Sequence, residues 1–397
     1  MRILRIVYEW PPPWDGLAAA PYEMTSSQAT MGHKIDIFSG KWAKAGPIEE
    51  LPNVTLHTFF REPVGGTLNL LISPIMFFYY LFWRRKNSPD IIHSHGHFGI
   101  WIYWYWKFLK KHFPHAKELK TPLVVHFHNT VKGRAESLEE KGVKVKLISK
   151  YLAWPLAEKS DRWAVACADA MIFVSTPIKD EAIKFYGADS AKCFVIETGV
   201  NVRLFSSIGS EEKLKTRQDL GLLENDKVIL NHGAIVERKN VHLLVEALRF
   251  LPRIYKLLLV GPVSDNDYEE KLKETMNTYH LEDRVVRIGY TPYPQVPIAF
   301  QASDIFVLPS SWEGFPKVVV QSLACGVPVL ASGFKAAQEI GGLFYLESST
   351  PEAIAQKIQE IVEAKSQVDI GFIRTHYSWD NMARKVQGVY DKLVRSA

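Results

Sequence analysis

Residues 309–328 read PSSWEGFPKVVVQSLACGVP, directly after the apolar run of residues 304–308. The apolar run predicts a buried strand, and residues 309–316 predict a loop because they include a glycine and two prolines. A short helix follows, which Gly326 and Pro328 end. This order of strand, loop and helix predicts an anion-binding site, since backbone N–H groups at the start of a helix lack partners and the helix dipole favours negative charge.

The same alternation of short apolar runs and helical stretches continues through the whole chain. Many of the runs are apolar over most of their length, as strands buried on both faces require. The candidate strands are residues 1–9, 33–39, 54–59, 90–95, 122–128, 170–175, 193–197, 227–235, 255–261, 285–289, 304–309, 328–332 and 343–346. Strands that alternate with helices are typical of parallel sheets covered by helices. We therefore predict an α/β fold of two Rossmann-like, doubly wound domains that face each other across a cleft, with ligands at the carboxyl ends of the strands.

Length and composition agree with two soluble domains. A chain of 397 residues is long for one domain, for which roughly 100–200 residues is usual. Apolar residues make up 47% and charged residues 23%, close to the average of globular proteins. The net charge of +5 is spread along the chain, so we expect no nucleic-acid partner, and a small anionic substrate or an acidic membrane surface fits better.

The three cysteines, Cys167, Cys193 and Cys325, show no C-x-x-C spacing. Neither a disulfide framework nor a zinc site is indicated, and we expect a reducing cytoplasm. Residues 1–9 predict a short strand and lack the length of a signal peptide, so we expect no export.

Residues 64–83 carry no charge and are followed by Arg84, Arg85 and Lys86. This length would permit a membrane span. The segment contains two glycines and Pro74, however, and is densely apolar only in its later part. Three interpretations stay open: a buried or half-buried helix, which we favour, a helix at the membrane interface, and a span.

The loop and helix of residues 309–328 resemble the E-x7-E signature of the GT-B glycosyltransferases of family four, usually written E-G-F-G…E-A-x-A-x-G-x-P-V. The positions that agree are Glu313, Gly314, Phe315, Ala324, Gly326 and Pro328. Gln321 stands where the family has its second glutamate, which accepts hydrogen bonds from the ribose of a nucleotide-sugar donor. The amide of Gln321 still accepts, but without charge assistance, so donor affinity or donor identity would differ. A strand–loop–helix unit that only packs is the alternative.

A second segment, residues 233–241, follows a strand and resembles the family's G-R-L-x-x-x-K-G pattern. Lys239 matches the lysine of that pattern. Ala234 occupies the position of the arginine, and we propose Arg238 as its substitute. Two adjacent cations can neutralise a diphosphate, and stabilising the charge on a leaving phosphate is usually the largest catalytic contribution. A solvated surface pair is the alternative.

In the first half of the chain, Gly16 lies in a proline-rich loop after the first strand. This loop resembles the family's first-strand loop, where a glycine lets the backbone approach the donor diphosphate and the acceptor, although an ordinary turn would also explain it. Residues 123–129 resemble the family's strand that ends in a histidine near the transferred sugar, and His128 is the matching position.

Histidines cluster at the ends of two candidate strands, as His93, His95 and His97 and as His126 and His128. Imidazole is a common zinc ligand, but no cysteine and no H-E-x-x-H helix accompanies them, so we expect no metal site. The first cluster resembles the family's P-D-x-x-H-x-H strand, which is mainly structural. A core position is the alternative for His93 and His126.

The resemblance covers nearly the whole chain and implies both an organisation and a reaction. Residues 1–203, completed by a helix within 379–397, would form the acceptor-side domain, and residues 204–378 the nucleotide-sugar-binding domain. The reaction would move a sugar from a UDP- or GDP-sugar to an acceptor hydroxyl with retained anomeric configuration, without metal ion or cofactor. The acceptor would be a glycan, a lipid-linked molecule or a small molecule.

The resemblance also implies a set of site residues. Glu313 would hold sugar hydroxyls, His128 would contact the sugar near the reacting centre, and Lys239 would stabilise the diphosphate, which makes these three the catalytic candidates. Backbone N–H groups would complete the anion site, except at Pro316, which has none. The expected binding residues are Gly16, Arg238, Lys239, Glu313, Gly314, Phe315, Pro316, Lys317, Val318 and Gln321.

Other classes of protein share the architecture. A nonhydrolysing epimerase is one, and a phosphorylase would need a lysine for pyridoxal phosphate in a context that the sequence does not show. The departures at Ala234 and Gln321 leave open a binding or scaffold protein with a decayed donor site. Because Glu313, Lys239 and His128 are present, we favour an enzyme.

Two segments place aromatic residues beside cations. Residues 77–83 precede Arg84–Lys86, and residues 101–106 precede Lys107, Lys110 and Lys111. Aromatic residues favour the membrane interface and cations favour an anionic surface, so these segments would dock the first domain on the inner membrane leaflet if both expose one face. The alternative is that the aromatic residues fill the core of this domain.

Overall fold

The computed structural model describes residues 1–12, 14, 16–41, 50–59, 68–140, 147 and 149–395. These residues divide into two compact units. Apart from Glu140, the described residues up to Thr198 and from Trp379 onward form the first unit, and Gly199–Ser378 form the second. The boundary predicted from the sequence follows residue 203.

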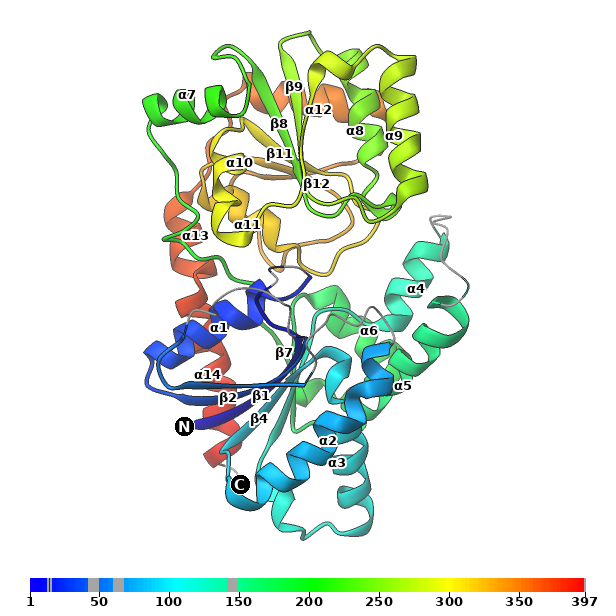
Figure 1. Cartoon of the computed structure of the whole chain (residues 1–397), viewed down its shortest axis with the longest axis vertical. Coiled ribbons are helices and arrows are strands. Elements are labelled where there is room, and N and C mark those ends of the chain that lie inside the picture. Colours follow the sequence, from blue (N-terminus) through cyan, green and yellow to red (C-terminus); the bar gives the residue numbers. More distant parts are fainter. Residues whose placement is uncertain are drawn as a thin grey trace. The chain divides into compact units, whose positions relative to one another are not determined.

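Within the described residues, the first unit contains a parallel seven-stranded sheet in the order β3-β2-β1-β4-β5-β6-β7 (Figure 1). The strands are β1 (Arg2–Glu9), β2 (Lys34–Lys41), β3 (Val54–Thr58), β4 (Ile91–His95), β5 (Leu123–Phe127), β6 (Ala170–Phe173) and β7 (Cys193–Val195). The chain winds outward from β1 to β3 and then returns to place β4 beside β1. The winding direction therefore reverses between β1 and β4, which is where open α/β sheets bind ligands.

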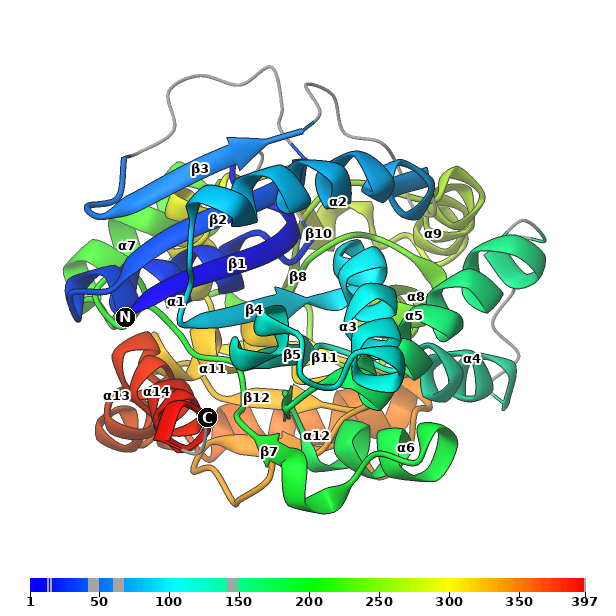
Figure 2. The same ribbon diagram turned by 90° about the horizontal axis from the view of Figure 1, so that it is seen from below.

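Helices cover both faces of this sheet (Figure 2). They are α1 (Ala19–Thr30), α2 (Leu68–Lys86), α3 (Ile100–His112), α4 (Val131–Glu140), α5 (Trp154–Cys167), α6 (Thr176–Tyr186) and α14 (Trp379–Arg395). Helices α1 and α14 pack against each other, and α3 packs against α2 and α5.

The C-terminal helix α14 belongs to the first unit because its apolar face completes that unit's core. Met382 and Val386 are fully buried together with Ile3 of β1 and Ile35 of β2. The other face of α14 is largely polar and exposed, as a helix that lies on a core requires.

The second unit contains a parallel six-stranded sheet, within the described residues, in the order β10-β9-β8-β11-β12-β13. The strands are β8 (Lys227–His232), β9 (Tyr255–Val260), β10 (Val285–Ile288), β11 (Ile305–Leu308), β12 (Val329–Ala331) and β13 (Leu343–Tyr345). Its helices are α7 (Ser210–Asp219), α8 (Val241–Ala247), α9 (Asn266–Thr278), α10 (Pro297–Gln301), α11 (Lys317–Ala324), α12 (Pro351–Glu363) and α13 (Ile370–Tyr377). Here the winding reverses between β8 and β11, the two strands whose following loops carry the predicted donor-site residues.

Every strand of both sheets overlaps a segment predicted from the sequence. The runs are apolar because both faces of each sheet are covered, so most strand side chains are buried. The predicted α/β class with two doubly wound parallel sheets is confirmed. Cys167, Cys193 and Cys325 are free thiols.

The uncharged segment of residues 64–83 lies partly outside the described residues, which resume at Leu68. Helix α2 buries Met76 and Tyr80 and exposes Ile75 and Phe78, so its described part is a half-buried helix. Among the described residues, no helix is both long enough and apolar enough to cross a membrane.

Candidate active site

In the second unit, the loops that follow β8 and β11 are joined by hydrogen bonds. The backbone N–H of Ser311 donates to the carbonyl of Arg238 over 2.8 Å. The side-chain amide of Asn240 donates to the carbonyl of Pro309 and to the Ser311 hydroxyl, each over 3.0 Å. The two loops meet because β8 and β11 are neighbours in the sheet, although they lie far apart in the sequence.

Arg238 and Glu313 form an ion pair across these two loops. Arg238 Nη1 lies 2.7 Å from Glu313 Oε1, and the Ser310 hydroxyl donates to the same oxygen over 3.0 Å. Their side chains are only 28% and 15% exposed, so solvent screens this pair less than a surface pair. The sequence predicts both residues for the site but does not predict that they pair.

Lys239 lies beside this pair with its ammonium buried. Its Nζ donates to the His232 carbonyl over a long 3.5 Å. Burial lowers the pKa of Lys239 to about 8, Glu313 acts against this shift, and the cations Arg238 and Lys317 add to it. A buried ammonium with one weak carbonyl acceptor favours an anionic ligand.

Gly233 makes room for this ammonium. Its φ is +131°, and a Cβ at this position would collide with Lys239 Nζ. The glycine that opens the G-x-x-x-x-x-K segment is therefore required both for backbone conformation and for the position of the lysine.

Gln321 lies in the second turn of α11 and is 3% exposed. Its Oε1 has no hydrogen-bond partner in the described part of the chain. A buried acceptor without a donor costs about 1–3 kcal/mol. This side chain is therefore suited to accept a hydrogen bond from a bound molecule, as a ribose hydroxyl would supply.

Helix α11 begins at Lys317, and its N-cap residue Pro316 provides no side-chain cap. Val318, in the first turn, is buried. Gly314 lies in the preceding turn, and the Phe315 ring is buried against Tyr377, with ring centroids 6.0 Å apart and parallel planes. Packing of the Phe315 ring thus fixes the loop that directly precedes the first backbone N–H groups of α11.

In the first unit, Gly16 follows β1 with a φ of +53°. The backbone N–H of Leu17 donates to the Glu9 carboxylate, and a Cβ on Gly16 would collide with that carboxylate. Pro13 and Asp15 of this loop lie outside the described residues. The sequence analysis does not predict this contact between Glu9 and the loop that contains Gly16.

His128 follows β5 in the first unit and is half-buried. Its Nε2 lies 3.2 Å from Nδ1 of His95 at the end of β4. Nearby, His97 Nε2 lies 2.8 Å from Asp161 Oδ1. The fully buried positions of His93 and His126 agree with the core alternative.

Two family models match the chain. "Glycosyltransferase Family 4" matches residues 14–204, and "Glycosyl transferases group 1" matches residues 212–385, so together they span most of both units. The chain belongs to the GT-B glycosyltransferases of family four. It is therefore a glycosyltransferase, and both sheets agree with the GT-B fold.

Individual relatives agree with this assignment. An uncharacterised glycosyltransferase of Methanocaldococcus jannaschii is 24% identical over 98% of both chains. The Escherichia coli UDP-Gal:alpha-D-GlcNAc-diphosphoundecaprenol alpha-1,3-galactosyltransferase is 27% identical over 73% of this chain and 69% of its own. The solved sucrose-phosphate synthase of Thermosynechococcus elongatus superposes with a TM-score of 0.81 at 18% identity over all of both chains, which supports the fold.

The glycosyltransferase fold thus brings together, in the second unit, most of the residues predicted for donor binding. Arg238, Lys239 and Glu313 interact directly or through charge, and Lys317 adds a further positive charge. Gly16 and His128 belong to the first unit. The roles of all these residues stay predictions.

The lowered pKa of Lys239 predicts pH-dependent binding of nucleoside diphosphates. Lys239 is protonated below pH 8 and loses its charge above it, so affinity should fall as the pH rises through 8. A bound diphosphate raises the pKa of Lys239, and binding at pH 8.5 should therefore take up protons. The phosphates themselves are fully ionised there. Calorimetry in buffers of different ionisation enthalpy measures this uptake.

Lys239→Arg is the matched control because arginine keeps its charge over this range. Its affinity should not vary between pH 7.5 and 8.5, and its binding should take up no protons. Equal proton uptake by the wild type and this variant would assign the titration to another group.

Gln321 Oε1, which has no donor in the part of the chain that the structure describes, predicts that Gln321→Glu tightens nucleoside diphosphate binding. A charged acceptor strengthens a hydrogen bond from a ribose hydroxyl by about 1 kcal/mol, or roughly fivefold in affinity. Calorimetry of UDP and GDP binding measures the change, with Gln321→Leu as the comparison that should weaken binding. Unchanged affinity in both variants would mean that the ribose lies elsewhere.

Proposed function

We propose that the chain transfers a sugar from a UDP- or GDP-sugar to an acceptor hydroxyl, with retention of configuration and without a metal ion. The observation that carries this proposal is the set of side chains that the second unit provides at Lys239, Glu313 and Gln321. They offer a buried ammonium, a carboxylate and a buried amide oxygen that has no donor among the described residues, which match the diphosphate, the sugar hydroxyls and the ribose of one nucleotide sugar.

In this proposal the protein's own cations replace a metal ion at the diphosphate. Lys239 and Arg238 would stabilise the charge that develops on the leaving nucleoside diphosphate, and Lys317 adds positive charge at the start of α11. Such preorganised charge is most effective where water is excluded, and burial of the Lys239 ammonium supports that condition.

Glu313 would bind sugar hydroxyls while Arg238 and Ser310 hold one of its oxygens. The ion pair therefore fixes the direction of the carboxylate before the donor arrives. It also keeps Arg238 at the site in place of the arginine that the family has at the position of Ala234. The ion pair thus supports Glu313 as a positioned hydrogen-bond acceptor for the sugar hydroxyls. Glu313 is not proposed as a nucleophile.

His128 would contact the transferred sugar near the reacting centre. Retention requires that the acceptor hydroxyl enters on the face from which the diphosphate leaves, and the resemblance implies no enzyme nucleophile for this step. An oxygen of the leaving diphosphate on that face is then the base that can accept the proton of the acceptor hydroxyl.

The acceptor would be lipid-linked, although a glycan or a small molecule remains an outcome of the test. The name of the Escherichia coli relative includes a UDP-sugar donor and a diphosphoundecaprenol acceptor. That relationship supports a UDP-sugar donor for this chain and a lipid-linked acceptor held in a membrane.

A surface on α2 and α3 supports contact with such a membrane. Phe78 and Phe82 of α2 are 60% and 64% exposed, and Trp104 and Phe108 of α3 are also exposed. The two helices contact each other, and neither contains an acidic residue. Apolar rings on a surface without negative charge are suited to the headgroup region of an anionic bilayer.

The predicted cations divide into two groups. Arg84 donates to Asn87 and Thr121, and Lys110 pairs with Asp169, so these two stabilise the first unit. The exposed cations of this surface are Arg85, Lys86, Lys107 and Lys111. The alternative that the aromatic residues fill the core of this domain also holds in part, because other aromatic residues of α2 and α3 are buried.

The first test of the proposal is turnover. The variants Lys239→Ala and Glu313→Ala should each lower turnover by about 100-fold or more, as the loss of preorganised charge commonly does. Activity should persist in excess EDTA, and NMR of the product should show the anomeric configuration of the donor. The exposed controls Lys215→Ala and Glu274→Ala should retain wild-type rates.

Each other outcome has a distinct meaning. Near-wild-type turnover of either site variant would overturn the assignment of the site. Loss of activity with EDTA or an inverted product would overturn the mechanism. Nucleotide-sugar binding without transfer or hydrolysis would favour the decayed, scaffold-like alternative.

Membrane contact is tested by co-sedimentation with liposomes. Binding should require anionic lipid, weaken with salt, and fall in the double variant Phe78→Asp with Phe82→Asp. Leu223→Asp, which changes an exposed apolar side chain of the second unit, is the control that should bind as the wild type does. Absence of binding at low salt would favour a soluble acceptor.

A further inference from the structure

Four histidines of the first unit share one face of two adjacent strands. His95 of β4 and His126 of β5 are directly paired in the parallel register. His93 lies two residues before His95, and His128 lies two residues after His126. Because side chains alternate along a strand with a period of two, all four rings project on the same side.

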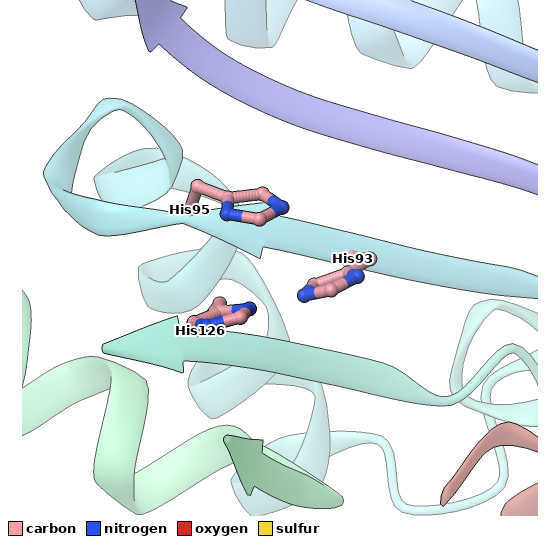
Figure 3. Close-up of side chains that lie close together, drawn as sticks. All are labelled: His93, His95 and His126. Atoms are coloured by element: carbon pink, nitrogen blue, oxygen red, sulfur yellow. The ribbon is translucent and has the colours of Figure 1, made fainter. Parts of the chain in front are cut away.

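The four rings form a continuous stack. Centroids lie 4.5 Å apart between His93 and His95, 4.9 Å between His95 and His126, and 4.7 Å between His126 and His128. At its inner end, His93 Nδ1 lies 2.5 Å from the hydroxyl of Tyr390 on α14. Figure 3 shows the first three rings in nearly parallel planes, two on β4 and one on β5.

A metal ion is the first alternative for this stack. One nitrogen from each of His93, His95 and His126 lies within 4.8 Å of the others. Burial and the nearby guanidinium of Arg5 lower the pKa of all three rings, however, and this positive charge opposes a bound cation.

The surroundings of His95 indicate which ring donates in the hydrogen bond between His95 and His128. Burial lowers the pKa of His95 well below its ordinary value, so the ring is neutral and carries one proton. Its Nε2 has no partner in the described part of the chain. A proton there would leave a buried N–H without an acceptor, which is rarer than an unfilled lone pair. The proton therefore sits on Nδ1, which donates to His128 Nε2.

We propose that His95 is a positioning residue that fixes the tautomer of His128. Because His128 Nε2 accepts from His95, a neutral His128 carries its own proton on Nδ1. A substrate oxygen that contacts Nδ1 would then meet an N–H donor and not a base. This inference rests on the proposed contact between His128 and the transferred sugar.

The stack explains how His95 is held for this task. The His93 and His126 rings contact the His95 ring, and the backbone pairing with β5 fixes the position of His95 in the sheet. The Tyr390 hydroxyl in turn holds His93. Since all three buried rings stay neutral, the stack adds no positive charge beside Arg5. The neutral stack thus holds His95 so that its Nδ1–H donates to His128 Nε2.

The test is the tautomer of His128, measured by two-bond ¹H–¹⁵N correlation spectra of the full chain. The His128 signals are assigned by their absence in His128→Gln. In the wild type, Nδ1 should be protonated and Nε2 should be an acceptor. In His95→Leu, His128 should shift toward the Nε2–H form, and turnover should fall roughly 10- to 100-fold through misorientation.

His95→Asn should rescue both readouts because the asparagine Nδ2 lies where the histidine Nδ1 was and also donates. His115→Leu, which removes an exposed histidine of the same unit, should change neither. Thermal unfolding of each variant verifies that the first unit stays folded.

A wild-type His128 protonated on Nε2, or a tautomer that does not change in His95→Leu, would overturn the inference. Zn²⁺ binding by calorimetry that is lost in His126→Gln would also overturn it, because the stack would then be a metal site. Full turnover of His128→Ala would instead contradict the proposed role of His128, and the tautomer spectra would still decide the inference separately.

Discussion

The predicted donor-site loops of the second unit depend on the burial of the Lys239 ammonium beside the Arg238–Glu313 pair. Burial is the main cause that lowers the pKa of Lys239 to about 8, and the cations Arg238 and Lys317, which repel the ammonium, add to this shift. A bound diphosphate would stabilise the charged ammonium, so the burial that disfavours this charge in the empty site favours an anionic ligand. The bonds from Asn240 and Ser311 hold the two loops in place against this repulsion.

Much of the fold follows from local pattern. Strands of covered parallel sheets are apolar along their length, and each of them was recognisable for that reason. The candidate site residues Lys239 and Glu313 were recognisable because each stands in a segment that resembles a family motif. Gly233 illustrates the physical content of such a motif, since a side chain there would displace the lysine.

The interactions between distant segments could not be predicted. Arg238 and Glu313 are 75 positions apart, and they meet only because the sheet order places β11 beside β8. The contact of Glu9 with the Gly16 loop and the bond between His95 and His128 depend in the same way on three-dimensional structure. Arg5 is a further case: a charged residue inside an apolar run is buried, because Thr25 and Gln28 of α1 accept its hydrogen bonds.

One nucleoside diphosphate should contact both the buried ammonium of Lys239 and Gln321 Oε1, which has no donor among the described residues. A crystal structure of the chain with UDP decides this. We expect a diphosphate oxygen at about 3 Å from Lys239 Nζ and a ribose hydroxyl that donates to Gln321 Oε1. A nucleotide bound away from these two side chains, or a diphosphate held by a metal ion, would overturn the proposed donor site.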